Sequence, residues 1–462
     1  MRLAGLWIVL VAAYAATLGI PQRPGLDYAG AEPHHLLAAE SIVSDHDVDL
    51  RDEYRDRAYA DWYPGRLKTD GSVVGGRLVE PHGVGFALLI APAYALGGPR
   101  AVQAEMAALL ALAFVLAAAL ARRMVPEPWA TAGAAACGLS PPALAAGTAI
   151  APGVAAAPIL AGAALCALAV RERPRRRYVF GGALLLAVLP WLGWSYVIPG
   201  LPVAWALVTW ALRERRRLAA IATAEALSAS LVFYATVNDR FYGGLTPRSA
   251  STGGLPDLPW GYVDRLPRLA SLWLDREIGL LRWAPLLALA GLAVWLLYRS
   301  RRDQLARVVP ARREAEACAR LLLAIVVADV AVTALAAASP LRGAAFPGVA
   351  LVASLPAVAA LTAWGLRHVP RTLAAVLAVL TLGTSAWIVA REHSEGWLGM
   401  HTDAPWGPLV AVFPRFDGPP AWPIAACALI VAGAAALAVR ERRASGEWRR
   451  AAAASRTSRV MH

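Results

Sequence analysis

Residues 3–20 read LAGLWIVLVAAYAATLGI, an apolar run that follows Arg2 and contains no charged side chain. Its length and composition are typical of a helix that spans a membrane. Similar runs recur along the 462-residue chain, which is 58% hydrophobic and has a mean hydropathy of +0.49. Soluble domains are rarely so apolar. The sequence therefore predicts an all-α fold, a polytopic transmembrane helical bundle.

The formal net charge of +13 comes from basic clusters that flank the apolar runs. These clusters are residues 122–123, 171–177, 213–217, 299–313, 367–371 and the chain from 440 onward. Basic side chains in such positions mark the cytoplasmic side of a membrane protein, which argues against nucleic acid as a partner. We therefore predict a multi-pass protein of the inner (cytoplasmic) membrane, in contact with the lipid bilayer, with both termini in the cytoplasm.

Placing all basic clusters in the cytoplasm gives about twelve spans. The spans cover residues 3–20, 101–121, 129–149, 152–170, 178–198, 199–212, 218–237, 278–298, 320–338, 345–365, 372–390 and 422–440. One transmembrane domain, residues 1–440, is followed by a basic cytoplasmic tail, residues 441–462, whose composition predicts disorder. Three polar segments fall outside, at residues 21–100, 238–277 and 391–421.

Two apolar segments are irregular. Residues 82–98 form a short run with Pro92 inside it, which favours a helix on the outer surface over a span. Residues 178–212 contain Pro190, Pro199 and Pro202, which favours two short or broken helices over one long helix.

The long first outer loop contains most of the side chains that could do chemistry. Its segment 26–37 reads LDYAGAEPHHLL. Gly30 and Pro33 predict a helix that starts near Glu32 and runs through Ser41. A carboxylate at a helix N-terminus is stabilised as the anion. Glu32 could then act as a general base, bind a divalent cation with one of the two histidines that follow, or simply cap the helix.

A second acidic string, residues 44–54, reads SDHDVDLRDEY. Asp47 and Asp49 would lie on one side of an extended segment, where two carboxylates could face a ligand. The glycine and the terminal glutamate of a helix–loop–helix calcium site are absent from this string. A solvated loop is the alternative for these acids.

Several segments, in this order, resemble the GT-C superfamily of integral membrane glycosyltransferases. The resemblance is to bacterial relatives of the family that includes the protein O-mannosyltransferases and the lipid A aminoarabinose transferase. The matching segments are residues 31–36 (AEPHHL), 45–50 (DHDVDL), 82–85 with 91–94, 238–247, and 275–285. The implied fold is a GT-C-like bundle with a long first outer loop.

The resemblance implies a transferase that takes a sugar from a polyprenyl-phosphate donor at the outer face of the cytoplasmic membrane. The acceptor would be a glycan, a lipid or a protein. Glu32, with Asp27 as a second candidate, would deprotonate the acceptor. Basic groups would stabilise the departing phosphate, a task suited to Arg. The substrate-binding candidates are Arg248, Arg276, Arg282, His34, His82, Asp47 and Asp49. No cofactor is implied, although a divalent cation is an option.

The sequence departs from the family pattern at Ala31, where relatives carry the Asp that often serves as base. Either Glu32 serves alone, or Asp27 replaces it, or the chain has lost transferase activity. Residues 341–347 also lack the aromatic and Arg-bearing motif of the relatives.

Two other functions fit the sequence: a non-catalytic relative of the transferases, and a transporter of a lipid or small solute. A transporter usually has ionisable groups within its spans, and Asp329, Glu105 and Glu225 are the candidates here. Residues 71–76 lack the Lys-Ser/Thr ending of a phosphate-binding loop, which argues against a nucleotide-sugar donor.

Overall fold

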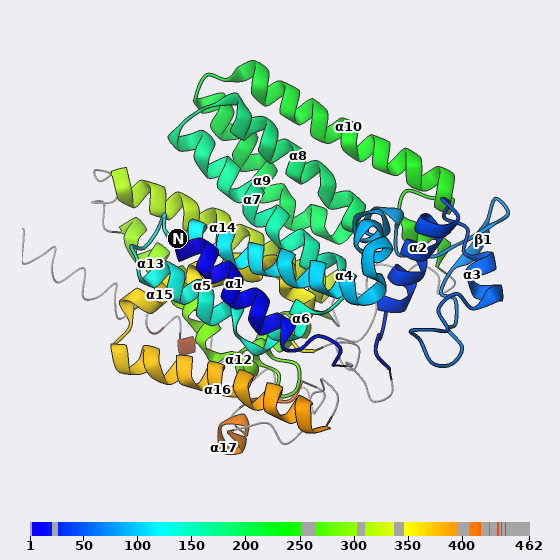
Figure 1. The fold of residues 1–462 in the computed structure, drawn as a ribbon. Coiled ribbons are helices and arrows are strands. Elements are labelled where there is room, and N and C mark those ends of the chain that lie inside the picture. The colour runs from blue at the N-terminus through cyan, green and yellow to red at the C-terminus, as the bar shows by residue number, and fades with distance from the viewer. Residues whose placement is uncertain are drawn as a thin grey trace, which may run out of the picture.

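The computed structural model describes residues 2–20, 26–251, 265–302, 310–336, 346–395, 406–411 and 413–416, and the single residues 425, 432, 433, 436 and 439. Helices account for most of this part of the chain (Figure 1). The protein is an all-α, multi-pass membrane bundle, as the sequence predicts. The predicted span 422–440 and the tail 441–462 lie almost wholly outside the described residues.

Seven helices in the described part of the chain are long and apolar enough to cross a membrane. They are α4 (Val84–Ala121), α7 (Pro152–Glu172), α9 (Trp194–Arg213), α10 (Arg217–Tyr242), α14 (Pro310–Ala336), η5 with α15 (Val349–Ser354 and Leu355–His368) and α16 (Arg371–Glu395). Two shorter apolar helices are α1 (Arg2–Ala15) and α13 (Leu289–Arg302). Figure 1 shows α10 along one side of the bundle and α16 along the opposite side, with α7, α4 and α15 between them.

Small residues allow the central helices to pack closely. A Cβ atom added to Gly133 of α5 (Trp129–Gly138) would lie 2.5 Å from the Cβ of Ala363 in α15. A Cβ added to Gly365 would lie 2.2 Å from the carbonyl oxygen of Leu289. Because lipid is as apolar as the side chains, close contact between small residues is a main source of helix association in a membrane.

The predicted span 129–149 is wrong as a single helix. The structure has two shorter helices, α5 and α6 (Pro141–Gly147), with Leu139 and Ser140 between them. Pro141 and Pro142 cause the division, because a proline has no backbone N–H and restricts the residue before it. The predicted span 278–298 is divided by Pro285 in the same way, into α12 (Leu280–Trp283), η3 (Pro285–Ala288) and α13.

Residues 178–212 form two helices, as predicted, but the boundary differs. The helix α8 (Arg176–Leu192) ends and α9 begins on either side of Gly193. The three prolines lie inside the helices, where side chains and neighbouring helices can satisfy the freed carbonyl groups. Gly97 and Gly98 leave helical geometry inside α4, which separates its first part from residues 99–121 near the predicted boundary.

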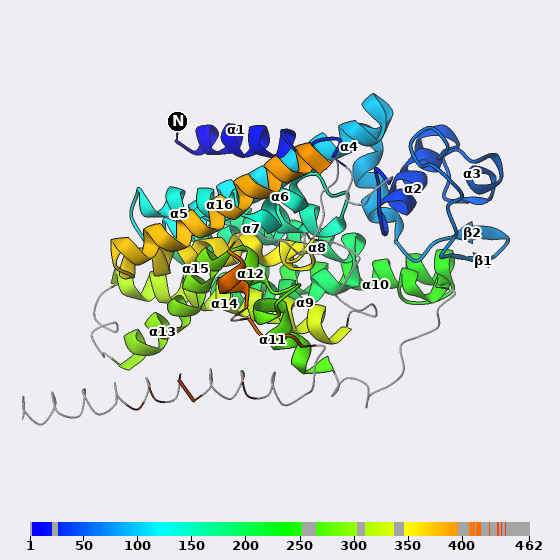
Figure 2. The same ribbon diagram turned by 90° about the horizontal axis from the view of Figure 1, so that it is seen from below.

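The first outer loop folds into a small unit at one end of the bundle. It contains α2 (Glu32–Ser44), α3 (Arg51–Asp56) and the antiparallel strands β1 (Ser72–Val74) and β2 (Arg77–Val79). Figure 2 shows this hairpin beside the C-terminal end of α10. The helix predicted to start near Glu32 is confirmed, and it extends three residues beyond Ser41. The buried side chains of the unit include Leu37, Leu50, Tyr59 and Leu67.

Asp275, directly after α11 (Pro267–Leu274), fixes the backbone of another loop. Its side chain is 0% exposed and accepts hydrogen bonds from the backbone N–H groups of Glu277 (2.7 Å), Ile278 (3.0 Å) and Phe416 (3.0 Å). We expect Asp275→Ala to lower the free energy of unfolding by about 3 kcal/mol, because three buried N–H groups lose a charged acceptor. Chemical unfolding in detergent measures the change. The exposed Asp61, changed to Ala, is the control, and an equally small effect of both substitutions would contradict the prediction.

Glu53 of α3 is a buried carboxyl group in the outer unit. The residue is 4% exposed, and burial raises the pKa of its carboxyl group to about 7, although the Ser41 hydroxyl acts in the opposite direction. The unfolded chain has the ordinary pKa of about 4.3, so folding should become less favourable as the pH rises from about 4 to 7.

We expect Glu53→Gln to remove this pH dependence. Relative to the wild type, the variant should gain about 3–4 kcal/mol of stability between pH 4 and pH 8, because its amide never ionises. Melting temperatures of both proteins at the two pH values measure the gain. Other titrating groups are common to both proteins and cancel in the difference. A difference that is the same at both pH values would contradict the assignment.

Candidate functional site

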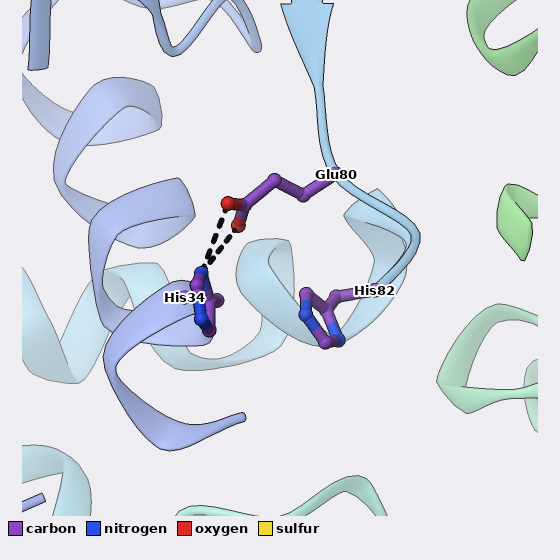
Figure 3. Close-up of side chains that lie close together, drawn as sticks. All are labelled: His34, Glu80 and His82. Atoms are coloured by element: carbon purple, nitrogen blue, oxygen red, sulfur yellow. Dashed lines mark hydrogen bonds and ion pairs between the residues drawn. The ribbon is translucent and has the colours of Figure 1, made fainter. Parts of the chain in front are cut away.

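Three side chains of the outer unit converge in the described structure: His34, Glu80 and His82 (Figure 3). The Nδ1 atom of His34 lies 2.9 Å and 3.0 Å from the two carboxylate oxygens of Glu80. The rings of His34 and His82 are stacked, with centroids 5.2 Å apart and planes inclined by 24°. One nitrogen or oxygen atom from each residue lies within 4.8 Å of the other two.

A helix start and a hairpin bring these residues together. Pro33 occupies the first turn of α2, so His34 lies near the N-terminus of that helix. In the hairpin Val74 pairs with Arg77, and Gly75 and Gly76 have φ values of 57° and 81°. A two-residue turn with positive φ at both positions matches the twist of the paired strands. The turn reverses the chain, and Glu80 follows directly after β2.

Asp49 attaches the hairpin to the acidic string. Its carboxylate accepts a hydrogen bond of 2.9 Å from the backbone N–H of Leu78 and is also bound by the guanidinium group of Arg51. The Arg51 hydrogen bonds and the Leu78 N–H hold the pKa of Asp49 below its usual range, despite some desolvation. Asp47 is exposed and accepts hydrogen bonds from Ser41 Oγ (3.2 Å) and the Asp49 N–H (2.9 Å). Both acids therefore shape the loop.

Glu80 is buried and fully engaged. The hydroxyl group of Tyr54 donates a hydrogen bond to Oε1, and Thr69 Oγ1 lies 3.4 Å from the same oxygen. Burial would raise the pKa of Glu80, but the hydrogen bonds and charge of His34 and the Tyr54 hydroxyl outweigh it and hold the pKa below its usual range. Glu80 is therefore an anion at neutral pH.

Burial keeps two of the nearby imidazoles neutral. The pKa of His35 is well below its usual value, chiefly because of burial and also because of the neighbouring histidines. The pKa of His82 is lowered by burial and by His34. The ring of His35 lies between His82 and Phe86, with centroid distances of 5.1 Å and 4.8 Å. Among the described residues, His82 Nε2 is a buried atom with no hydrogen-bond partner.

His82 also lines a cavity of about 520 Å³ at the ends of α4, α8, α9 and α10. The polar and aromatic residues of its wall include Asp70, Arg248, Asn238, Trp191, Trp194 and Tyr234. Arg248 lies in η1 (Pro247–Ala250), and Gly243, with a φ of 70°, ends α10 in the left-handed conformation that favours glycine. Val79, Tyr242 and Ala250 form a buried cluster that fixes this loop against the hairpin.

Two glycines shape the mouth of this cavity. Gly83 has a φ of 76°, which other residues rarely adopt. At Gly85, a Cβ atom would lie 2.3 Å from the carbonyl oxygen of Trp191, so α4 can approach the end of α8 only without a side chain there. Residues 82–85 are one of the segments that resemble the transferases. Local backbone conformation and helix packing explain why this segment has glycine at two positions.

From the sequence-predicted set, the structure places His34 against His82, and His82 lines the same cavity as Arg248. Glu32 is 8% exposed, and its carboxylate accepts hydrogen bonds from the backbone N–H groups of Ala29 (3.0 Å) and Ile150 (2.9 Å). Asp27 is exposed. Neither acid is among the residues that line the cavity.

Arg276 and Arg282 lie together elsewhere, between α11 and the end of α12. The Arg282 guanidinium donates a hydrogen bond to the carbonyl oxygen of Arg276 and lies 4.6 Å from the ring centroid of Trp283. Neither arginine lines the cavity. The segment 341–347, which departs from the family pattern, falls mostly outside the described residues.

Sequence reasoning missed Glu80, Tyr54 and Asp70. A signal for Glu80 was present, because the Val-Val-Gly-Gly-Arg-Leu-Val run of residues 73–79 predicts a hairpin. Glu80 follows this hairpin and precedes Pro81 and His82. No local pattern marks Tyr54 or Asp70 as neighbours of a histidine.

The acid predicted for a transporter has a structural partner. Asp329 of α14 is buried and interacts with the hydroxyl and backbone N–H groups of Ser354, the residue before α15. A carboxylate at a helix N-terminus binds the free amides there. Glu105 is half-buried and Glu225 is exposed.

The sequence matches no protein-family model and no curated protein. Among solved structures, the chain is similar to the crystal structure of ArnT from Cupriavidus metallidurans in the apo state. That similarity has a TM-score of 0.47 and 15% sequence identity, and it covers 84% of this chain and 65% of ArnT. The chain thus spans slightly less than two thirds of the length of ArnT. No assignment of residues follows from a likeness of this size.

Proposed function

We propose that the protein is a membrane glycosyltransferase that moves a sugar from a polyprenyl-phosphate donor to an acceptor at the outer face of the cytoplasmic membrane. The observation that supports this proposal most is the cavity of about 520 Å³ at the ends of apolar helices. A lipid-linked sugar consists of an apolar chain, a phosphate and a sugar ring, joined in that order. The cavity offers a cationic side chain, Arg248, for the phosphate and aromatic side chains for the sugar.

Arg248 is the group proposed to bind the phosphate. As the sugar leaves, negative charge develops on the phosphate oxygens, and a guanidinium group can donate two parallel hydrogen bonds to them. Arg248 is half-buried in the cavity wall, where its interaction with an anion is screened less than on an open surface. The uncharged Asn238 and His82 line the same cavity and offer further polar contacts.

The sugar would lie against the aromatic part of the wall. Trp191 is fixed by edge contacts with Tyr234, at a centroid distance of 5.5 Å, and packs beside Phe233. Trp194 also lines the cavity. The flat apolar faces of such rings complement the C–H face of a sugar. The volume is within the range that small-ligand sites occupy.

In the proposed reaction an acceptor hydroxyl attacks the anomeric carbon, and the bond from that carbon to the phosphate oxygen breaks. The proton of the hydroxyl passes to a carboxylate, and the polyprenyl phosphate leaves as an anion. Glu32 is the proposed base, and Asp27 is the second candidate. Contacts with the acceptor or donor are also proposed for Arg276, Arg282, Asp47 and Asp49. The proposal itself is argued from Arg248, the aromatic residues of the cavity and Glu32.

The test is transfer of a radiolabelled sugar by the purified full-length protein in lipid vesicles. We expect transfer from a panel of polyprenyl-phosphate sugars and none from the corresponding nucleotide sugars. Transfer from nucleotide sugars alone would contradict the proposal. A folded protein that turns over no donor would favour the non-catalytic relative, with Ala31 as the reason.

A further inference from the structure

We propose that His34, Glu80 and His82 bind one divalent transition-metal ion, with Zn²⁺ as the best fit. The proposal concerns a binding site and does not depend on the reaction proposed above. Figure 3 shows the three side chains close together, with Glu80 facing the His34 ring and the His82 ring beside them; they come from α2 and from the segment between β2 and α4.

The spacing of the donor atoms fits an ion. Zinc lies about 2.0–2.2 Å from nitrogen and oxygen ligands, so tetrahedral ligands are separated by about 3.4 Å. His34 Nδ1 and a Glu80 oxygen are already 2.9 Å apart, and one donor atom from each residue lies within 4.8 Å of the others. The His34 and His82 rings are stacked, so binding would require them to turn until one nitrogen of each points to the ion.

The chemical types of the donors select the metal. Two imidazoles and one carboxylate are a common ligand set of zinc sites that keep a fourth position open. Ca²⁺ and Mg²⁺ prefer sites built from oxygen ligands alone.

The surroundings hold the donors in place. The Tyr54 hydroxyl binds the Glu80 carboxylate, as outer partners of metal ligands usually do. His35 contacts the edge of the His82 ring, and Phe86 in turn packs against His35. His82 Nε2 is buried and has no hydrogen-bond partner in the part of the chain that the structure describes. A buried polar atom of this kind needs a partner, and a metal ion would supply one.

The fourth position would open toward the cavity. Asp70 has an oxygen 3.8 Å from His34 Nε2, and its side chain is 64% exposed. Asp70 and His82 both line the cavity that contains Arg248. The open position could therefore hold water, the Asp70 carboxylate or an oxygen atom of an anionic ligand.

Metal binding by the full-length protein tests the proposal. The affinity tag is removed, the protein is stripped with a chelator, and ZnCl₂ or CoCl₂ is added in detergent. We expect one ion per chain after dialysis. The Co²⁺ form should have a visible absorption band with the intensity of a four- or five-coordinate ion, and Zn²⁺ should raise the melting temperature. Glu80→Gln and His82→Ala should each weaken Zn²⁺ binding at least about tenfold.

His46→Asn is the matched control, because His46 is an exposed histidine of the same loop with a φ of 62°, which Asn tolerates. This variant should bind Zn²⁺ as the wild type does. The melting temperature of each stripped variant shows whether it folds. If His82→Ala does not fold, the isosteric Glu80→Gln variant tests the proposal alone. Wild-type protein that retains no stoichiometric ion, or a folded Glu80→Gln that binds Zn²⁺ as tightly as the wild type, would overturn the proposal. Transfer activity is not needed for either result.

Discussion

Replacing Glu32 with glutamine is expected to lower the rate of sugar transfer by about a thousandfold, because the amide cannot accept the proton of the acceptor hydroxyl. The hydrogen bonds from the Ala29 and Ile150 N–H groups favour the ionised carboxylate that a base requires. The measurement is single-turnover transfer from a polyprenyl-phosphate sugar in lipid vesicles.

In the Glu32→Gln variant, a loss of stability must be distinguished from the loss of the proton acceptor. The glutamine amide would place an NH₂ group opposite one of the two backbone N–H groups, which costs about 1–3 kcal/mol. The melting temperature and the affinity for the donor therefore have to be measured beside the rate. A folded Glu32→Gln variant with full activity would exclude Glu32 as the base.

Asp27→Asn is the matched comparison for Glu32→Gln, because Asp27 is exposed in the same loop and no structural cost is expected. If Asp27→Asn loses activity while Glu32→Gln keeps it, Asp27 is the base. If the wild type transfers sugar and both variants remain active, the base lies outside this pair.

Replacing Arg248 with alanine is expected to lower kcat/KM by about a hundredfold or more, because the developing phosphate charge loses its cationic partner. Arg248→Lys should recover only part of the rate, since Lys keeps the charge but not the two parallel hydrogen bonds. Rates at several donor concentrations separate a loss of binding from a loss of turnover.

Arg240→Ala is the control for Arg248→Ala. Arg240 is an exposed cation near the end of α10, close to Arg248 in sequence, and it does not line the cavity. Its loss should change the rate less than about threefold, because exposed charges are screened by salt. Equal effects of the two substitutions would show that the phosphate is attracted by the general basic surface, and would contradict a specific role for Arg248.

Local sequence patterns predicted a large part of the fold. The apolar runs identified the membrane class and most helices, and the Gly30 and Pro33 signals located the start of α2. The errors occurred where local signals compete. Proline divided the predicted span 129–149, whereas the prolines of residues 178–212 were accommodated inside helices and Gly193 formed the boundary. A proline breaks a helix or not according to which neighbours can satisfy the freed carbonyl groups, and sequence alone does not show those neighbours.

The candidate site was predictable only in part. His34 and His82 were selected from the sequence, but Glu80 joins His34 across 46 positions of the chain. The Glu32 carboxylate meets the backbone of Ile150 across 118 positions. The sequence by itself determined that the chain is a helical membrane protein with an acidic loop, because hydropathy and turn residues act over short stretches. The tertiary structure decided which side chains of that loop meet and that Arg248 shares a cavity with His82, because packing between distant segments sets those distances.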